Sequence, residues 1–334
     1  MTDMDDRSSS PFIPPFLALP VGIVAVSTAS ILIRFAQDYA SSLTVAAFRL
    51  GLAVLFLAPF VLLRNREELS SLKAREWKYA LLSGGFLALH FATWITSLEY
   101  TTVASSVVLV CTSPIWVALL APIFLDERIS RVVLIGIGMA FLGGSMVGLS
   151  DSCYWSVGGI SCPPWAEFVR GEALLGDVLA LVGAVCGASY LMVGRHLRAK
   201  MSLLPYIFVV YGVAAVGLIA AMLLIDGVPG VFPARVYGWF VVLAILPQIV
   251  GHSILNWALR YLSSAYVSLT LLGEPVGSTL LAYIFLGESP GVLKVIGAIL
   301  ILTGILIASY RRRMPLKMDQ NRSDRGERQG NQGH

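Results

Sequence analysis

Long apolar runs separated by short polar stretches dominate this chain. A hydrocarbon core of roughly 30 Å needs about 20 mostly apolar residues per helix. Ten runs of about that length lack scattered charge, namely 16–36, 43–63, 79–98, 102–124, 132–149, 174–194, 203–225, 238–258, 263–286 and 292–310. Since lipid offers backbone groups no water partner, such continuous runs indicate helices. The pattern predicts an all-α integral membrane protein with ten transmembrane helices.

Composition agrees with this pattern, because 57% of the residues are apolar and only 13% are charged. A soluble globular domain is excluded by such values. Residues 1–10 are acidic rather than basic and no small-residue cleavage site closes the first run, so a cleavable signal peptide is not expected. The first run is therefore predicted to stay as a membrane helix.

The placement of lysine and arginine predicts the orientation. Cytoplasmic loops of membrane proteins accumulate these residues. With the N-terminus inside, the inner loops and tail hold Arg64, Arg66, Lys73, Arg75, Lys78, Arg128, Arg131, Arg195, Arg198, Lys200, Arg260, Arg311, Arg312, Arg313 and Lys317. The opposite side holds Arg170 and Arg235, with Arg34 and Lys294 near helix ends. Both termini are predicted to be cytoplasmic, with the basic charge facing anionic lipid of a cytoplasmic membrane rather than nucleic acid.

An internal repeat appears when the sequence is shifted by 161 residues. The strongest block aligns 100–127 with 261–288, including Pro114 with Pro275. The third and eighth runs need a shift of 162, which places His90 on His252. The repeat unit is five helices, and an odd number of helices makes the second copy enter the membrane from the other side. Inverted repeats of this kind are typical of alternating access around a site near the midplane.

The repeat divides the chain into five predicted regions. They are a cytoplasmic segment at 1–15, a first repeat at 16–149, an outward loop at 150–172, a second repeat at 173–310, and a basic, disordered cytoplasmic tail at 311–334. The tail is polar and rich in Asn, Gln, Gly, Arg and Asp, so it cannot bury enough apolar area to order itself.

Several local motifs add to this repeat. They are the SerPro at 113–114, the GluPro at 274–275 and the PheLeu-x-Glu endings at 124–127 and 285–288. Together with ten helices in two repeats, they make residues 17–310 resemble the EamA-type transporters of the drug/metabolite transporter superfamily. The resemblance implies a bacterial inner-membrane exporter or exchanger of amino acids, related metabolites or amphiphilic compounds. It also implies a central cavity shared by both halves.

Glu274 is the first candidate for binding because it lies near the centre of the ninth run. Ionisable groups inside lipid are expensive, so they are paired, reach an interface or face a polar cavity. The repeat aligns Glu274 with Ser113, so the shared scaffold does not require a carboxylate. A proton or a substrate amine can bind there. The alternative is a protonated or Arg-paired carboxyl that holds helices together.

Arg49, about two turns into the second run, also breaks the repeat because it aligns with Val210. A guanidinium binds carboxylates in bidentate fashion, so Arg49 is a candidate for a substrate carboxylate. A structural ion pair, or a side chain that reaches the outer interface, is the equal alternative.

Four further candidates form a stripe in the third and eighth runs. His90 and His252 match each other, and Trp94 and Asn256 follow one turn later on the same faces. The histidines serve either as scaffold, bonded to backbone carbonyls, or as a proton relay. Trp94 is also a candidate for stacking on a substrate, particularly a cationic one.

Other intramembrane residues divide into one candidate and several structural groups. Trp116 joins Trp94 as a candidate for contact with a cationic substrate. Glu127 and Glu288, at the ends of the fourth and ninth runs, are expected to bond backbone or loop groups, and Arg34 to reach an interface.

The cysteines and histidines show no spacing typical of a metal site, and no cofactor is expected. Cys153 and Cys162 lie in the longest outward loop, where a disulfide is sterically feasible if that side is oxidising. Whether they pair stays open.

The sequence bears differently on four classes of function: an enzyme, a channel, a sugar antiporter and a metabolite transporter. An intramembrane enzyme would need a set such as HExxH or GxSxG, which the chain lacks. A channel would favour polar rings from several copies. An antiporter of phosphorylated or nucleotide-linked sugars would need several intramembrane cations, but Arg49 is accompanied by the acidic Glu274. The sequence favours a transporter of small amino-acid-like or amine-bearing metabolites, driven by protons or a counter-substrate. It does not specify an oligomeric state.

Overall fold

Helices make up nearly all of the described chain. The computed structural model describes residues 13–125, 131–152, 154–156, 159–161, 164, 171–262 and 264–310. The first half contains α1 Pro15–Ser27, α2 Ala29–Gln37, α3 Ser42–Arg64, α4 Arg66–Ser70, α5 Ala74–Tyr100, α6 Val103–Val110, α7 Ser113–Leu125 and α8 Arg131–Ser152. The second contains α10 Glu172–Arg198, α11 Leu203–Ile225, α12 Ala234–Leu243, the π-helix η1 Ala244–His252, α13 Ser253–Ala258, α14 Ser264–Thr270, α15 Gly273–Leu286 and α16 Val292–Tyr310.

Eight helical segments in the described residues are long and apolar enough to cross a membrane. They are Leu17–Gln37, Ser42–Arg64, Ala74–Tyr100, Val103–Leu120, Glu172–Arg198, Leu203–Ile225, Ala234–Ala258 and Tyr266–Leu286. Two shorter apolar helices, Leu134–Val147 and Val292–Ile307, occupy the other two predicted positions. The sequence therefore located the helices correctly, but eight rather than ten meet the length and composition of a full span.

The fourth and ninth predicted helices are each interrupted at equivalent points. α6 ends at Val110 and α7 begins at Ser113, while α14 ends at Thr270 and α15 begins at Gly273. Pro114 is the second residue of α7, and Pro275 is the third residue of α15. Proline donates no hydrogen bond to the preceding turn but is well accommodated in the first turn of a new helix, so the sequence favours a restart there. The predicted runs at 102–124 and 263–286 contain helical spans, but each span has a two-residue turn that the sequence analysis did not predict.

Two other helices are irregular. Thr28 separates α1 from α2, and its hydroxyl donates to the carbonyl of Ala25 at 2.7 Å. The eighth predicted helix contains nine π-helical residues, Ala244–His252, with Pro247 inside them. Long π-helical stretches are rare and usually occur at functional sites.

Equivalent helices of the two halves pack antiparallel. In α8 and α16, a Cβ placed on Gly143 would lie 2.5 Å from the carbonyl oxygen of Gly297, and one on Gly304 would lie 2.6 Å from that of Gly136. Early residues of one helix thus meet late residues of the other. The second and seventh helices, α3 and α11, are also antiparallel. Ser41, just before the start of α3, donates to Asp226, just after the end of α11, and Gly51 farther along α3 faces Ile219.

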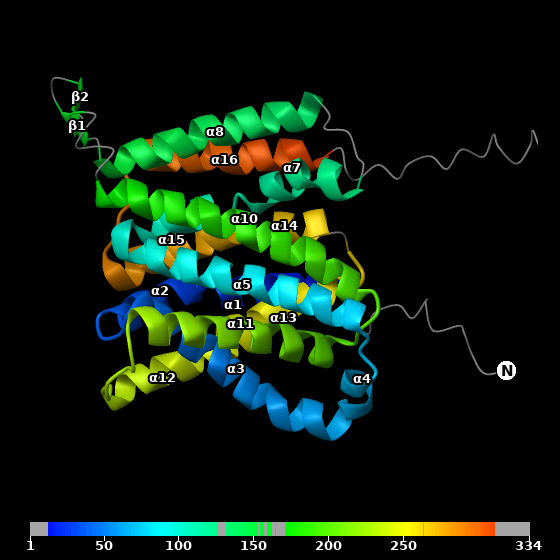
Figure 1. The fold of residues 1–334 in the computed structure, drawn as a ribbon. Coiled ribbons are helices and arrows are strands. Elements are labelled where there is room, and N and C mark those ends of the chain that lie inside the picture. Colours follow the sequence, from blue (N-terminus) through cyan, green and yellow to red (C-terminus); the bar gives the residue numbers. More distant parts are fainter. Residues whose placement is uncertain are drawn as a thin grey trace, which may run out of the picture.

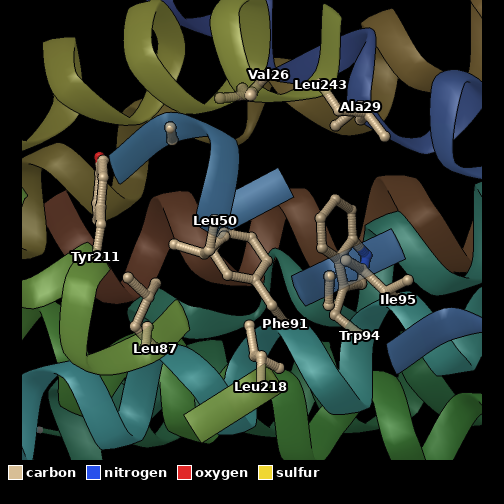
Figure 2. Packing of buried hydrophobic residues seen from close by; sticks show 14 of the residues in the cluster. Val26, Ala29, Leu50, Leu87, Phe91, Trp94, Ile95, Tyr211, Leu218 and Leu243 are labelled. Atoms are coloured by element: carbon tan, nitrogen blue, oxygen red, sulfur yellow. The ribbon is translucent and has the colours of Figure 1, made fainter. Parts of the chain in front are cut away.

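The helices lie in a stack (Figure 1). α8 and α16 pack together at one edge of the stack, α10 and α5 pack against each other in its middle, and α3 and α12 lie toward the opposite edge. Phe91 and Trp94 of α5 point into the apolar core beside Leu50 of α3 (Figure 2), and all three residues belong to one buried cluster. This core supports the site described below.

One end of the bundle is held by polar contacts of Glu288. Its carboxylate accepts a hydrogen bond from the backbone N–H of Val103 at 2.9 Å and lies 3.6 Å from the guanidinium of Arg34. The guanidinium of Arg34 also donates to the carbonyl of Leu98. The expectation that Glu288 bonds backbone groups is confirmed.

The outward loop contains a short antiparallel pair, β1 Tyr154–Ser156 and β2 Gly159–Ser161, which the all-α prediction did not include. Cys153, Cys162 and Glu127 lie outside the described residues, as do the segments 1–12 and 311–334. The predictions made for them stay predictions.

Candidate functional site

A cavity lies where the interrupted helices meet α5 and α10. The cavity volume is about 50 Å³, taken as the space that the centres of water molecules can occupy, which is enough for roughly three to five waters. Its polar lining comes from both halves of the chain and consists of His90, Ser113, Tyr190, His252, Asn256 and Glu274. The two halves therefore build one chamber that is mainly apolar and carries a few polar side chains from each half.

Glu274 is the carboxylate of this chamber. It is the second residue of α15, and its side chain is 8% exposed. The thiol of Cys111, in the other break, donates to its Oε2 at 3.8 Å. The N-terminus of a helix carries partial positive charge and favours an anion in its first turn. The restart of the helix at Gly273 thus places Glu274 where a carboxylate is stabilised.

The equivalent position of the first half is neutral. Ser113 begins α7, and its single O–H can donate to the carbonyl of Val110 at 3.0 Å or to that of Ala184 at 3.2 Å. Equivalent positions of the two halves therefore carry a carboxylate in one half and, in the other, a hydroxyl that is hydrogen-bonded to the backbone.

His90 is held in a defined orientation. Its Nδ1 donates to the carbonyl of Gly183 at 2.8 Å, since a carbonyl can only accept. Its ring stacks on Trp94, with centroids 5.9 Å apart and an angle of 21°. A Cβ added to Gly187 of α10 would lie 2.9 Å from Nδ1. The absence of a side chain at Gly187 therefore gives His90 its place on the cavity wall.

Asn256 joins a tyrosine network in the chamber lining. Its side-chain oxygen accepts from the hydroxyl of Tyr190 at 2.6 Å, and its amide donates to the hydroxyl of Tyr211 at 3.2 Å. Its backbone carbonyl accepts from Nε of Arg198 at 3.0 Å. Because these partners are buried, Asn256 is fixed as a rigid polar group of the lining.

Arg49 is fully buried on α3 but is not among the residues that line the chamber. Its Nε donates to Oε1 of Gln248 at 2.8 Å, and its guanidinium carbon lies 4.3 Å from the centre of the Phe91 ring. Phe91 in turn meets His252 edge to face, with centroids 5.3 Å apart. Phe91 thus lies between Arg49 and a residue of the cavity wall.

Trp116 does not belong to the lining either. Its indole N–H donates to the hydroxyl of Thr112 at 3.2 Å, and its ring packs against Val117, Ala188 and Met192. Of the seven site residues predicted from the sequence, the structure brings His90, Trp94, His252, Asn256 and Glu274 together around the cavity.

Sequence reasoning missed Gln248, Phe91 and Cys111. Gln248 carried a usable signal, because it is a polar residue within an apolar run and follows Pro247. In the shifted register it falls on Phe86, so it breaks the repeat as Arg49 and Glu274 do. Phe91 and Cys111 carried no such signal, since apolar residues and thiols are common inside membrane helices.

Potential metal ligands do not cluster in the part of the chain that the structure describes. No group of three or more His, Cys, Asp or Glu there can hold a metal ion. The chamber offers one carboxylate, two imidazoles, an amide and aromatic faces for contact with a ligand.

Similar proteins agree with this architecture. The chain is 26% identical over 294 residues to the uncharacterized transporter YyaM of Bacillus subtilis (strain 168), covering 85% of this chain and 90% of that one. It is 24% identical over 294 residues to an uncharacterized transporter of Archaeoglobus fulgidus, covering 87% and 94%. One solved crystal structure shares the fold with a TM-score of 0.61 at 19% identity, covering 90% of this chain and 99% of that one.

The two halves also match the same family profile separately. The profile describes the EamA-like transporter family and matches residues 15–149 and 174–310. Together these ranges include the helices that line the chamber and the antiparallel pairs around it. The chain thus belongs to the EamA-like transporter family of multi-pass membrane proteins.

Proposed function

We propose that this protein is an alternating-access secondary transporter that carries small amine-bearing or amino-acid-like metabolites through the chamber at Glu274. The observation that carries the proposal is the position of Glu274. Its carboxylate lies at the start of a half-helix, in a chamber built from both halves. Substrate sites of transporters with inverted repeats commonly lie at such interrupted helices near the midplane.

The chemistry of the lining favours an ammonium group. A carboxylate attracts a cation, and the face of Trp94 adds a cation–π contribution. Asn256 and His90 offer hydrogen-bonding groups. The described residues of the lining include no lysine or arginine, which a phosphorylated sugar would require. An amine-bearing or zwitterionic cargo is therefore preferred to a phosphorylated one.

The proposed mechanism uses ten membrane crossings in two inverted halves. The antiparallel packing of α3 with α11 and of α8 with α16 supports inversion, because each pair consists of repeat-equivalent helices. Two such halves have nearly equivalent packings, one open to each side. The chamber is then exposed alternately to the two compartments, which distinguishes this mechanism from a channel.

Polar contacts join helices at both ends of the bundle. Arg34 pairs with Glu288 at one end. At the other end, Lys200 lies 3.7 Å from Glu76, and the backbone N–H and hydroxyl of Ser202 donate to Glu68. Alternating access requires the contacts of one end to open while those of the other end stay closed. We infer that opening of the first end separates Arg34 from Glu288.

The membrane and orientation are also proposed. Lys73 and Arg75 follow α4 in the chain, and Lys200 lies 3.7 Å from Glu76, so these basic residues lie at the end of the bundle where Figure 1 shows α4. By the positive-inside rule, we infer that this end faces the cytoplasm and that both termini lie on the cytoplasmic side of a cytoplasmic membrane. Glu274 alternately binds a proton or the cargo amine, so a proton or a second cargo molecule is the coupled species.

Transport by the purified protein tests this proposal. Proteoliposomes are screened with small metabolites that carry a free amine and with their N-acetylated forms, with and without a pH gradient or preloaded cargo. We expect saturable uptake of one or more amines, stimulation by preloaded cargo or the gradient, and a loss of about tenfold or more on N-acetylation, since a charged hydrogen bond contributes about 1.5–3 kcal/mol. Non-saturable conductance, or uptake of phosphorylated sugars in place of amines, would contradict the proposal.

A further inference from the structure

The guanidinium of Arg49 is incompletely satisfied. Arg49 is fully buried, and Nε is the only one of its three nitrogens with a hydrogen-bond partner among the described residues. Both terminal nitrogens, Nη1 and Nη2, have none. The ring of Phe91 lies 4.3 Å from the guanidinium carbon. An aromatic face attracts the cation but supplies no lone pair, so these donors still need an acceptor.

No described carboxylate lies within 4.0 Å of Arg49. Glu274 interacts with it electrostatically but does not contact it. The only direct polar partner in the described chain is the neutral carboxamide of Gln248. A buried charge without a close counter-charge is strongly unfavourable. The position of Arg49 therefore calls for a negative group close to Nη1 and Nη2.

Two neighbouring side chains have the same need. Nε1 of Trp94 is a buried N–H donor without a partner in the described chain, and Nε2 of Gln248 has no well-formed hydrogen bond although the hydroxyl of Tyr211 lies nearby. Gln248 is bonded to Arg49, and the ring of Trp94 lies 5.9 Å from its guanidinium carbon. One cation and two neutral residues thus present N–H groups in one small region and share the lack of a well-placed acceptor. An anion is the chemical complement of such a set.

The position of this set relative to the chamber suggests how it is reached. Trp94 belongs both to the donor set and to the chamber lining, whereas Phe91 covers Arg49 and contacts His252 of the lining. Gln248 and His252 both lie in η1, whose π-helical hydrogen bonds and internal Pro247 leave its backbone less regular. A change in η1 or a rotation of Phe91 would connect Arg49 with the chamber.

We propose that Arg49, Gln248 and Trp94 form a buried binding site for a small monovalent anion. The occupant is either a free anion such as chloride or the carboxylate of the cargo. The second possibility rests on the transport function proposed above, with Glu274 holding the amine in the chamber. The first is independent of that function.

Thermal unfolding of the full-length protein in detergent tests the site. The melting temperature is measured in sodium chloride or sodium acetate against the bulky sulfonate salt sodium MES, at constant ionic strength. We expect a saturable rise of about 2 °C or more with chloride or acetate, because a ligand that binds only the folded state stabilises it. Equal melting temperatures in all three salts would overturn the proposal.

Two variants and a control locate the effect. Gln248→Glu supplies a carboxylate beside Arg49, so this variant is expected to melt higher than the wild type in MES and to lose its response to chloride and acetate. Arg49→Gln also loses the response, and if it fails to fold, Gln248→Glu alone decides. Arg34→Gln removes a cation from the pair with Glu288 and keeps the response. A normal response in Gln248→Glu would overturn the assignment.

Competition identifies the occupant and separates the two proposals. If an amino-acid cargo lowers the apparent affinity for chloride, the site receives the cargo carboxylate; if it does not, the site holds a free anion. Both outcomes support an anion site. If no anion raises the melting temperature but amine uptake still depends on Glu274, the anion site is contradicted and the proposed transport function stands. An anion response without such uptake would remove the proposed function alone.

Discussion

Replacement of Glu274 by glutamine is expected to lower the uptake of amine-bearing cargo by about tenfold or more. The change keeps the shape of the side chain and removes the charge that faces the chamber. A hydrogen bond to a charged group contributes about 1.5–3 kcal/mol, and each 1.4 kcal/mol is a factor of about ten in affinity. Initial rates in proteoliposomes at several cargo concentrations measure the loss.

Glu99→Gln is the matched control for this variant. Glu99 accepts hydrogen bonds from the backbone N–H and hydroxyl of Ser42, at 3.1 and 2.6 Å, and does not line the chamber. Its replacement is expected to leave uptake within about twofold, since glutamine keeps an acceptor oxygen. Normal uptake by Glu274→Gln under every gradient would show that the carboxylate only holds helices together.

Gly187→Val is expected to abolish transport while the protein stays folded. A Cβ at this position lies 2.9 Å from Nδ1 of His90 and 3.6 Å from Oγ of Ser113, so the valine enters a chamber of about 50 Å³. His90 must then leave the carbonyl of Gly183, to which it is bonded at 2.8 Å. Overpacking costs about 1–3 kcal/mol, which is a fraction of the stability of a domain. Uptake and thermal unfolding are measured on the same preparation.

Gly212→Val separates a blocked chamber from a weakened helix. Gly212 lies in α11, and a Cβ placed there meets nothing within 4 Å. This variant carries the same change in helix propensity without filling the chamber, so near-normal uptake is expected. Equal loss of uptake in both variants would show that the effect of Gly187→Val does not come from the chamber.

The sequence located the helices well because the residues of a membrane span must be predominantly apolar over about 20 positions. The boundaries of α11 and α16, Leu203–Ile225 and Val292–Tyr310, coincide with the predicted runs. The interruptions were harder to predict. The break between Thr270 and Gly273 is as apolar as the helix around it, so hydropathy alone does not mark it. Pro114 and Pro275 were the available local signals.

Breaks in the repeat identified one of the five predicted residues that line the chamber, whereas the other four came from polar and aromatic residues at matching positions of the two halves. Glu274 aligns with Ser113 and does line the chamber. Arg49 aligns with Val210, but its contact with Phe91 and Gln248 places it behind the chamber wall. Alignment identifies which residues the shared scaffold does not need, but the direction of a side chain depends on tertiary packing. Gln248 also breaks the repeat, but its bond to Arg49 depends on the irregular backbone of η1, which the sequence does not reveal.

Labelling of Cys111 tests the central claim, passage of cargo through the chamber, most directly. Cys111 is buried, lines the chamber and donates to Glu274. In a variant with serine at the other three cysteines, a membrane-impermeant thiol reagent is applied to right-side-out and inside-out vesicles. We expect labelling of Cys111 from both sides of the membrane, and protection by transported cargo in each vesicle orientation. Labelling from one side alone, or labelling that saturating cargo does not slow, would contradict it.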